Sequence, residues 1–112
     1  MPFKFSRCIS LQTDRMEDAV EFYEKVLGLR VLSRDDPCVE IDGSQNRLFI
    51  ETGKQGGPVF ELIVDDLETA RDELVSKGCE VVVWQGKGKD CYIRDPFGFM
   101  FNLWEDAEAF SD

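Results

Sequence analysis

The sequence contains no histidine, and acidic residues outnumber basic ones by 23 to 13, which gives a formal net charge of −10. Without histidine the chain lacks the commonest general base and any Ser-His or Cys-His dyad. An acidic surface repels phosphate backbones and anionic lipids, so we expect neither nucleic acid nor membrane as a partner. The sequence has no apolar run of membrane-spanning length and no apolar segment typical of a signal peptide.

Cysteine supplies four of the 112 residues. Cys8, Cys38, Cys79 and Cys91 are dispersed and form no CxxC pair, which predicts reduced thiols and a cytoplasmic location. With 112 residues, of which 43% are hydrophobic, the chain has the size and composition of one globular domain, residues 1–112.

Within this length the same order of signals occurs twice, in residues 5–53 and 58–105. Each repeat opens with an apolar strand, at Cys8–Thr13 and Val59–Val64, and continues with an amphipathic helix. A glycine suited to a helix C-terminus follows each helix, and three further strands come after it. The order β-α-β-β-β, twice, predicts an α+β fold.

The helices are expected at residues 15–27 and 66–77. Each follows a D-x-x-E pattern, Asp14 to Glu17 and Asp65 to Glu68, which predicts a capping box at each N-terminus. The predicted turns are Asp42–Asn46 and Asp95–Gly98, both rich in residues that favour chain reversal.

Three stretches carry a resemblance to a known family: EFYEKVLGLRV (residues 21–31), ELIVDDLETARDELVSKGCEV (61–81) and IRDPFGFMFNLWE (93–105). With the duplicated order, they resemble the glyoxalase/bleomycin-resistance/extradiol-dioxygenase superfamily, also called vicinal oxygen chelate proteins. The resemblance implies two tandem βαβββ units that form a curved mixed-sheet cup with the helices on the outside.

Metal-dependent members of that family hold a divalent ion in the cup. By the resemblance, the four ligand positions fall on Cys8, Glu51, Val59 and Asn102. Valine cannot coordinate a metal, and an amide oxygen is a poor ligand for a transition metal. We therefore expect no metal, no cofactor and no catalytic residue of the family's usual kind.

Strand parity predicts which side chains point into the cup, because alternate residues of a strand face opposite sides of a sheet. The expected ligand contacts are Cys8, Ser10, Gln12, Glu51, Val59, Glu61, Met100, Asn102 and Trp104. They combine polar groups, aliphatic surface and an indole, as small-molecule pockets do. Several also have a structural reading: Cys8 as a buried thiol, Ser10 and Gln12 as solvated positions, Glu51 and Glu61 as surface ion pairs, and Trp104, like Trp84, as a packing residue.

These features favour a metal-free protein that binds a small molecule, similar to the bleomycin-resistance branch, with an aromatic or cationic ligand and a homodimeric state. Two alternatives stay open at this point. One is a lyase, isomerase or dioxygenase-type enzyme with an atypical site. The other is an interaction subunit whose cup holds no ligand.

Overall fold

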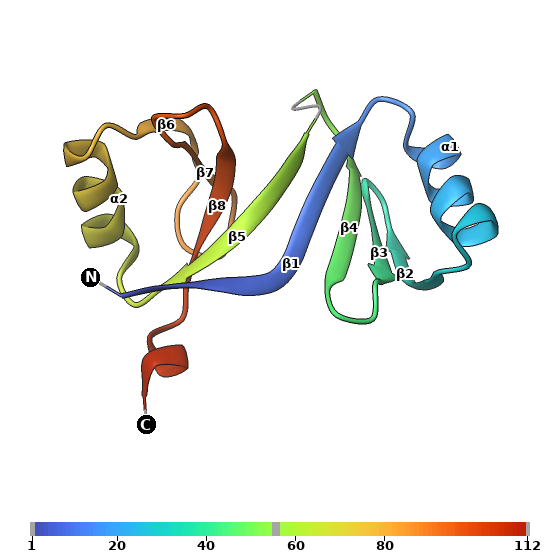
Figure 1. The fold of residues 1–112 in the computed structure, drawn as a ribbon, viewed down its shortest axis with the longest axis horizontal. Helices are drawn as coiled ribbons and strands as arrows, with labels where there is room; N and C mark the ends of the chain where they lie inside the picture. Colours follow the sequence, from blue (N-terminus) through green and yellow to red (C-terminus); the bar gives the residue numbers. More distant parts are fainter. Residues whose placement is uncertain (1, 55–56, 112) are drawn as a thin grey trace. The chain divides into compact units, whose positions relative to one another are not determined.

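The computed structural model describes residues 2–54 and 57–111 and contains eight strands in one mixed sheet. Figure 1 shows the elements in chain order. They are β1 (Phe3–Thr13), α1 (Met16–Glu21), η1 (Phe22–Val26), β2 (Arg30–Asp35), β3 (Cys38–Asp42), β4 (Arg47–Thr52), β5 (Pro58–Val64), α2 (Leu67–Ser76), β6 (Glu80–Trp84), β7 (Cys91–Arg94), β8 (Met100–Glu105) and η2 (Ala107–Phe110). The predicted order β-α-β-β-β, twice, and the α+β class are confirmed. Across the described residues, neither helix has the length and hydropathy needed to cross a membrane.

The chain divides into two compact units, which do not coincide with the two sequence repeats. The α1 unit comprises Arg7–Val59, and the α2 unit comprises Met1–Ser6 together with Phe60–Asp112. The strand β1 therefore contributes its first residues to the α2 unit and its remaining residues to the α1 unit.

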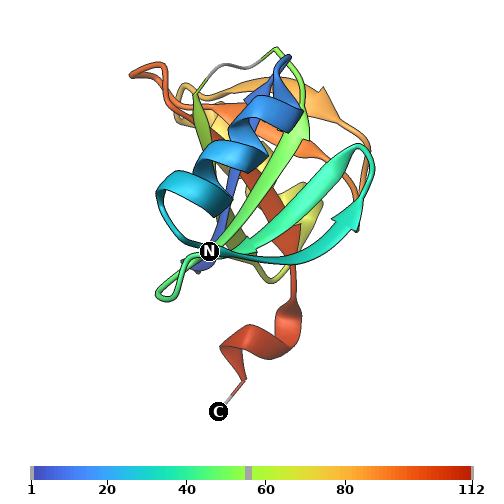
Figure 2. The same cartoon turned by 90° about the vertical axis from the view of Figure 1, so that its right-hand side faces the viewer.

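The α1 unit has the strand order β2-β3-β4-β1, with α1 packed on one face (Figures 1 and 2). Strand β1 pairs with β4 in parallel, and β3 pairs with β4 in antiparallel. Alternate residues Val39, Ile41 and Ile50 point toward α1, where they are fully buried against Val20. The opposite residues of the same strands form a second surface, which we call the face opposite α1.

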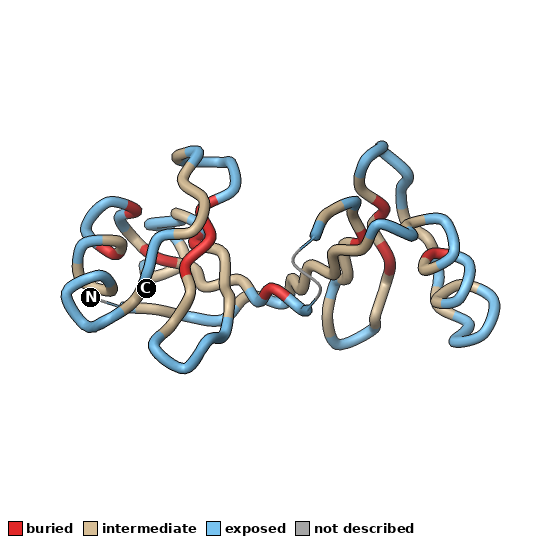
Figure 3. The backbone as a smooth tube through the Cα atoms, turned by 90° about the horizontal axis from the view of Figure 1, so that it is seen from above, coloured by how far each residue is buried: buried red, intermediate tan, exposed pale blue. Residues whose placement is uncertain are grey.

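The α2 unit repeats this arrangement with the order β5-β8-β7-β6. Its core consists of buried residues from α2 and from the strand faces turned toward it (Figure 3): Val64, Leu67, Ala70, Cys91, Ile93 and Leu103. Phe3 of β1 and Trp84 of β6 pack against this core. Trp84 is thus a packing residue, and the guanidinium of Arg71 lies 4.9 Å from the centre of its ring.

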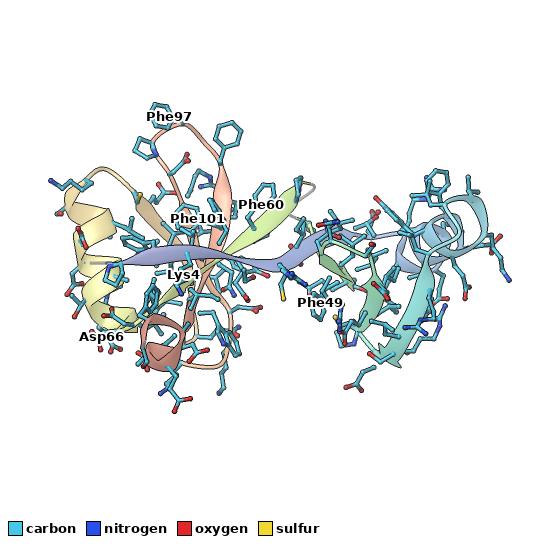
Figure 4. The ribbon with its side chains drawn as sticks, turned by 60° about the horizontal axis from the view of Figure 1, so that its bottom comes forward. Lys4, Phe49, Phe60, Asp66, Phe97 and Phe101 are labelled. Carbon is cyan, nitrogen blue, oxygen red and sulfur yellow. The ribbon has the colours of Figure 1, made fainter. Side chains whose placement is uncertain are left out.

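The N-terminal strand and the C-terminal turn of the α2 unit hold each other. The ammonium group of Lys4 donates a hydrogen bond to the carbonyl of Ala109. The same ammonium lies 4.9 Å from the centre of the Phe110 ring, as a cation–π contact (Lys4 is labelled in Figure 4).

Both predicted capping boxes are wrong. Helix α1 begins at Met16 without any side-chain cap, and Arg15 donates its backbone N–H to the Thr13 hydroxyl at 3.0 Å. Helix α2 is capped by Asp66 instead of Asp65, through the backbone N–H of Thr69 at 3.0 Å. The start of each helix lies one residue later than predicted.

The first helix also changes its winding. After Glu21 it continues as the π-helical segment η1, in which the N–H of Leu27 bonds the carbonyl of Phe22 at 3.1 Å. The predicted helix ends lie close to those observed. Gly28 and Gly78, which follow the two helices, both have positive φ, at 73° and 103°.

Candidate functional site

The face opposite α1 carries a hydrogen-bonded cluster centred on Glu51. Its Oε1 accepts from the Ser10 hydroxyl at 2.7 Å and from the Gln12 side-chain amide at 3.1 Å. All three side chains are half-buried. The pairing of β1 with β4 explains the arrangement, because Gln12 lies directly beside Glu51 in the parallel register. Two donors on one oxygen hold the carboxylate in a fixed orientation.

Cys38 joins the cluster from the other side of β4, where it is the antiparallel register partner of Glu51. Burial, with the added negative charges of Glu51, Glu40 and Asp35, raises the pKa of the Cys38 thiol to about 11. At neutral pH this side chain is an uncharged thiol and a poor nucleophile. The cluster therefore offers one fixed negative charge beside neutral hydrogen-bonding groups.

The same face is hollowed farther along the strands. A cavity of about 260 Å³ lies next to the turn between β3 and β4, and its wall includes Cys8, Arg47 and Phe49 (Phe49 is labelled in Figure 4). Phe49 stands two residues before Glu51 on β4, so both side chains face the same way. The volume is slightly below the range of drug-sized pockets and suits a small organic molecule.

In the α2 unit, the predicted contacts lie on the strand faces turned away from the core. Glu61 of β5 pairs in register with Asn102 of β8, and Ile63 pairs with Trp104. The side-chain oxygen of Asn102 accepts from the backbone N–H of Cys91 at 2.8 Å, so this amide links β8 to β7. Trp104 is 39% exposed, and Met100 is half-buried. Val59, the last residue of the α1 unit, lies at the start of β5 and is only 2% exposed.

The structure thus brings three of the predicted contacts, Ser10, Gln12 and Glu51, into direct hydrogen bonding within the α1 unit. Glu61, Met100, Asn102 and Trp104 lie on strands β5 and β8, Cys8 lines the cavity, and Val59 is buried. A ligand cup lined by both units stays a prediction.

A family model described as the glyoxalase/bleomycin resistance protein/dioxygenase superfamily matches residues 6–103, which is most of the chain. The chain belongs to this superfamily. No curated protein matches it.

Several solved structures share its fold at low sequence identity. A superfamily member from Vibrio splendidus 12B01 is 17% identical with a TM-score of 0.68, covering 94% of this chain and 100% of that one. The hypothetical protein BH1468 from Bacillus halodurans C-125 is 14% identical with a TM-score of 0.66, covering 95% of this chain and 96% of that one. The homoprotocatechuate 2,3-dioxygenase of Arthrobacter globiformis is 20% identical with a TM-score of 0.63; the match covers 88% of this chain but only 34% of the enzyme. These likenesses establish the fold alone.

The residues that the resemblance predicts at the superfamily's metal-ligand positions do not fit a divalent ion here. Val59 has no donor atom, and the oxygen of Asn102 is engaged by the backbone of Cys91. The described part of the chain contains no group of three or more Cys, Asp or Glu side chains placed to hold a metal.

Sequence reasoning missed the contribution of β3 and of the first part of β4 to this face. Cys38, Glu40 and Asp42 alternate along β3, as Arg47, Phe49 and Glu51 do along β4. The same parity argument that selected Glu51 would have selected them. Only the pairing of β3 with β4, which the sequence does not show, places them beside the predicted residues.

Proposed function

We propose that this protein binds a small aromatic or cationic molecule on the face opposite α1, without a metal. The observation that carries the proposal is the carboxylate of Glu51, half-buried and oriented by Ser10 and Gln12. A negative charge partly shielded from water attracts a cation more strongly than a fully exposed one. The aromatic ring of Phe49, on the same face, adds apolar surface and a cation–π partner.

The surroundings of Glu51 support binding over catalysis. Its register partner on β3, Cys38, is an uncharged thiol with a raised pKa, so the site has no activated nucleophile at that position. The hydrogen-bonded carboxylate is committed to two donors, which suits a fixed recognition group. The four cysteines, all free thiols, suit the reducing cytoplasm that we propose as its location.

The test compares two flat ligands of equal size, biphenyl-4-yl-trimethylammonium and biphenyl-4-carboxylate, by isothermal titration calorimetry. Glu51→Gln keeps the shape and a hydrogen-bond acceptor but removes the charge. We expect this variant to bind the cation about tenfold more weakly, or roughly 1.4 kcal/mol. The matched control is Glu68→Gln, which removes the same charge from an exposed position on α2.

Equal loss of cation affinity in both variants would attribute the effect to net charge and contradict the proposal. Cation binding that Glu51→Gln leaves unchanged would contradict it as well. Glu61→Gln, in parallel, tests whether the predicted contact on β5 takes part. The melting temperature of each variant shows that the fold is retained.

A further inference from the structure

The cavity on the α1 unit is lined by charged side chains. Some of them form ion pairs with other described residues of the protein and one does not. Glu40 forms an ion pair with Arg47, and Asp42 forms one with Arg30 at 3.5 Å. Asp42 also accepts the backbone N–H of Ser44 at 2.9 Å. Both carboxylates of the cavity wall are therefore matched by guanidinium groups of the protein itself.

Arg7 is the exception in this wall. Among residues 2–54 and 57–111, no carboxylate forms an ion pair with its guanidinium, although the chain carries ten more acidic than basic side chains. The segment from Pro2 to Thr13 contains no acidic residue. The cavity wall therefore includes one arginine that no carboxylate of the described residues neutralises, in the middle of β1, directly before Cys8.

The cavity and the Glu51 cluster lie on the same strands in sequence register. Cys8 pairs with Arg47 at the cavity, and Gln12 pairs with Glu51 at the cluster. Four residues separate these two pairs along each strand, which corresponds to about 13 Å at the usual rise of a strand. Phe49 lies between the two ends on the same face.

We infer that the ligand is dipolar, with an anionic group held by Arg7 in the cavity, an aromatic body on Phe49 and a cationic group at Glu51. Arginine suits a carboxylate, sulfonate or phosphate because its planar guanidinium donates two parallel hydrogen bonds. The inference rests on the proposed function for its cationic end only. Its anionic end rests on the cavity and on Arg7.

Three probes of one shape test it: biphenyl-4-carboxylate, biphenyl-4-yl-trimethylammonium, and 4′-(trimethylammonio)biphenyl-4-carboxylate, which carries both charges. Calorimetry should show at least tenfold tighter binding of the dipolar probe than of either single-charge probe. Arg7→Gln should weaken the carboxylate at least tenfold and leave the cation unchanged. Glu51→Gln should weaken binding of the cation at least tenfold and leave binding of the carboxylate unchanged.

Arg15→Gln is the matched control, since Arg15 is an exposed arginine paired with Asp18 on the far side of the α1 unit's sheet. Arg7→Lys keeps the charge without the planar fork and should retain part of the carboxylate affinity. Melting curves verify that each variant is folded.

Carboxylate binding that survives Arg7→Gln, or falls equally in Arg15→Gln, would overturn the anionic end. A dipolar probe no tighter than the single-charge probes would overturn the dipolar ligand. If Glu51→Gln leaves the affinity for the cation unchanged while Arg7→Gln weakens carboxylate binding, the proposed function is contradicted and the anion site at Arg7 is retained.

Discussion

The resemblance predicts that Asn102 falls at a metal-ligand position of the superfamily, but in this chain its side chain has a structural task. Its oxygen accepts the backbone N–H of Cys91, a residue that is fully buried. A buried N–H without an acceptor costs about 1–3 kcal/mol. The amide at this position therefore stabilises the β7–β8 pair.

We expect Asn102→Leu to lower the free energy of unfolding by about 1–3 kcal/mol, because the Cys91 N–H loses its acceptor. Asn102→Asp keeps an oxygen at the same place and should cost less. Urea denaturation followed by circular dichroism measures both. Equal stability of Asn102→Leu and the wild type would show that water or another group replaces the amide.

A second prediction at the residue scale concerns metal. Because Val59 and Asn102 stand at two of the ligand positions predicted from the resemblance, millimolar EDTA should leave the melting temperature unchanged, and added Mn²⁺, Fe²⁺, Ni²⁺ or Zn²⁺ should not raise it. A bound ion stabilises the folded state by mass action, so a true site would be visible in this measurement. Stoichiometric metal in the purified protein would favour the enzyme alternative over metal-free binding.

At the scale of the elements, the N-terminus of α2 is held by two carboxylates. The hydroxyl and the backbone N–H of Thr69 bind Asp66 and lower its pKa. Glu105 of β8 binds Lys87 and the backbone N–H of Leu67, each at 2.8 Å, and these contacts lower its pKa too. Negative charge at a helix N-terminus also interacts favourably with the helix dipole.

These two pKa shifts predict how stability depends on pH. A carboxyl group whose pKa is lower in the folded chain than in the unfolded chain stabilises fully above its unfolded pKa. That contribution is lost as the pH falls through the folded pKa, hence below about pH 4 for groups of this type. Urea unfolding between pH 3 and pH 7 should show a flatter profile for Glu105→Gln than for the wild type. A parallel profile would contradict the assignment.

Asp66→Ala and Asp14→Ala form a matched pair for the cap itself. Asp66 caps α2, whereas α1 has no side-chain cap, so only the first substitution should lower the melting temperature. A larger effect at Asp14 would restore the capping box predicted from the sequence.

The elements also show what the sequence can and cannot specify. Strand parity placed Ser10, Gln12 and Glu51 on one face, because the two-residue repeat of a strand is strict and Ile9, Leu11 and Ile50 mark the buried side. Parity does not choose between Asp65 and Asp66 as a cap, since the helix start depends on where β5 ends. Nor does it show a cavity, which depends on the β3–β4 turn and on how Arg7 and Arg47 are paired.

At the scale of the whole molecule, the chain has two cores. Ile50 belongs to the α1 unit and Leu103 to the α2 unit, and each is at most 1% exposed. Truncating either to alanine should cost about 2–5 kcal/mol. Hydrogen exchange should accelerate most in β3, β4 and α1 for Ile50→Ala, and in β7, β8 and α2 for Leu103→Ala. Uniform acceleration by both variants would show that the units unfold as one.

We propose that the protein is a homodimer, as expected from the sequence. Several large apolar side chains are exposed, among them Phe97 at 82% and Phe5 at 71%, and Figure 4 shows Phe97 at the tip of its loop. A subunit interface would remove such side chains from water. Light scattering at micromolar concentration should give about twice the 12.8 kDa mass of one chain. The mass of a single chain would refute the dimer.

The division of β1 between the two units determines which fragments of the chain contain a complete unit. A cut between the sequence repeats gives a C-terminal fragment beginning at Pro58, with α2 and its four strands. That fragment lacks Phe3, which packs on its core. It also lacks Lys4, which donates a hydrogen bond to Ala109 and makes a cation–π contact with Phe110. The C-terminal repeat by itself therefore lacks part of its own folded unit, and the missing part is a short N-terminal peptide. Supplying that peptide in trans should help the fragment to fold.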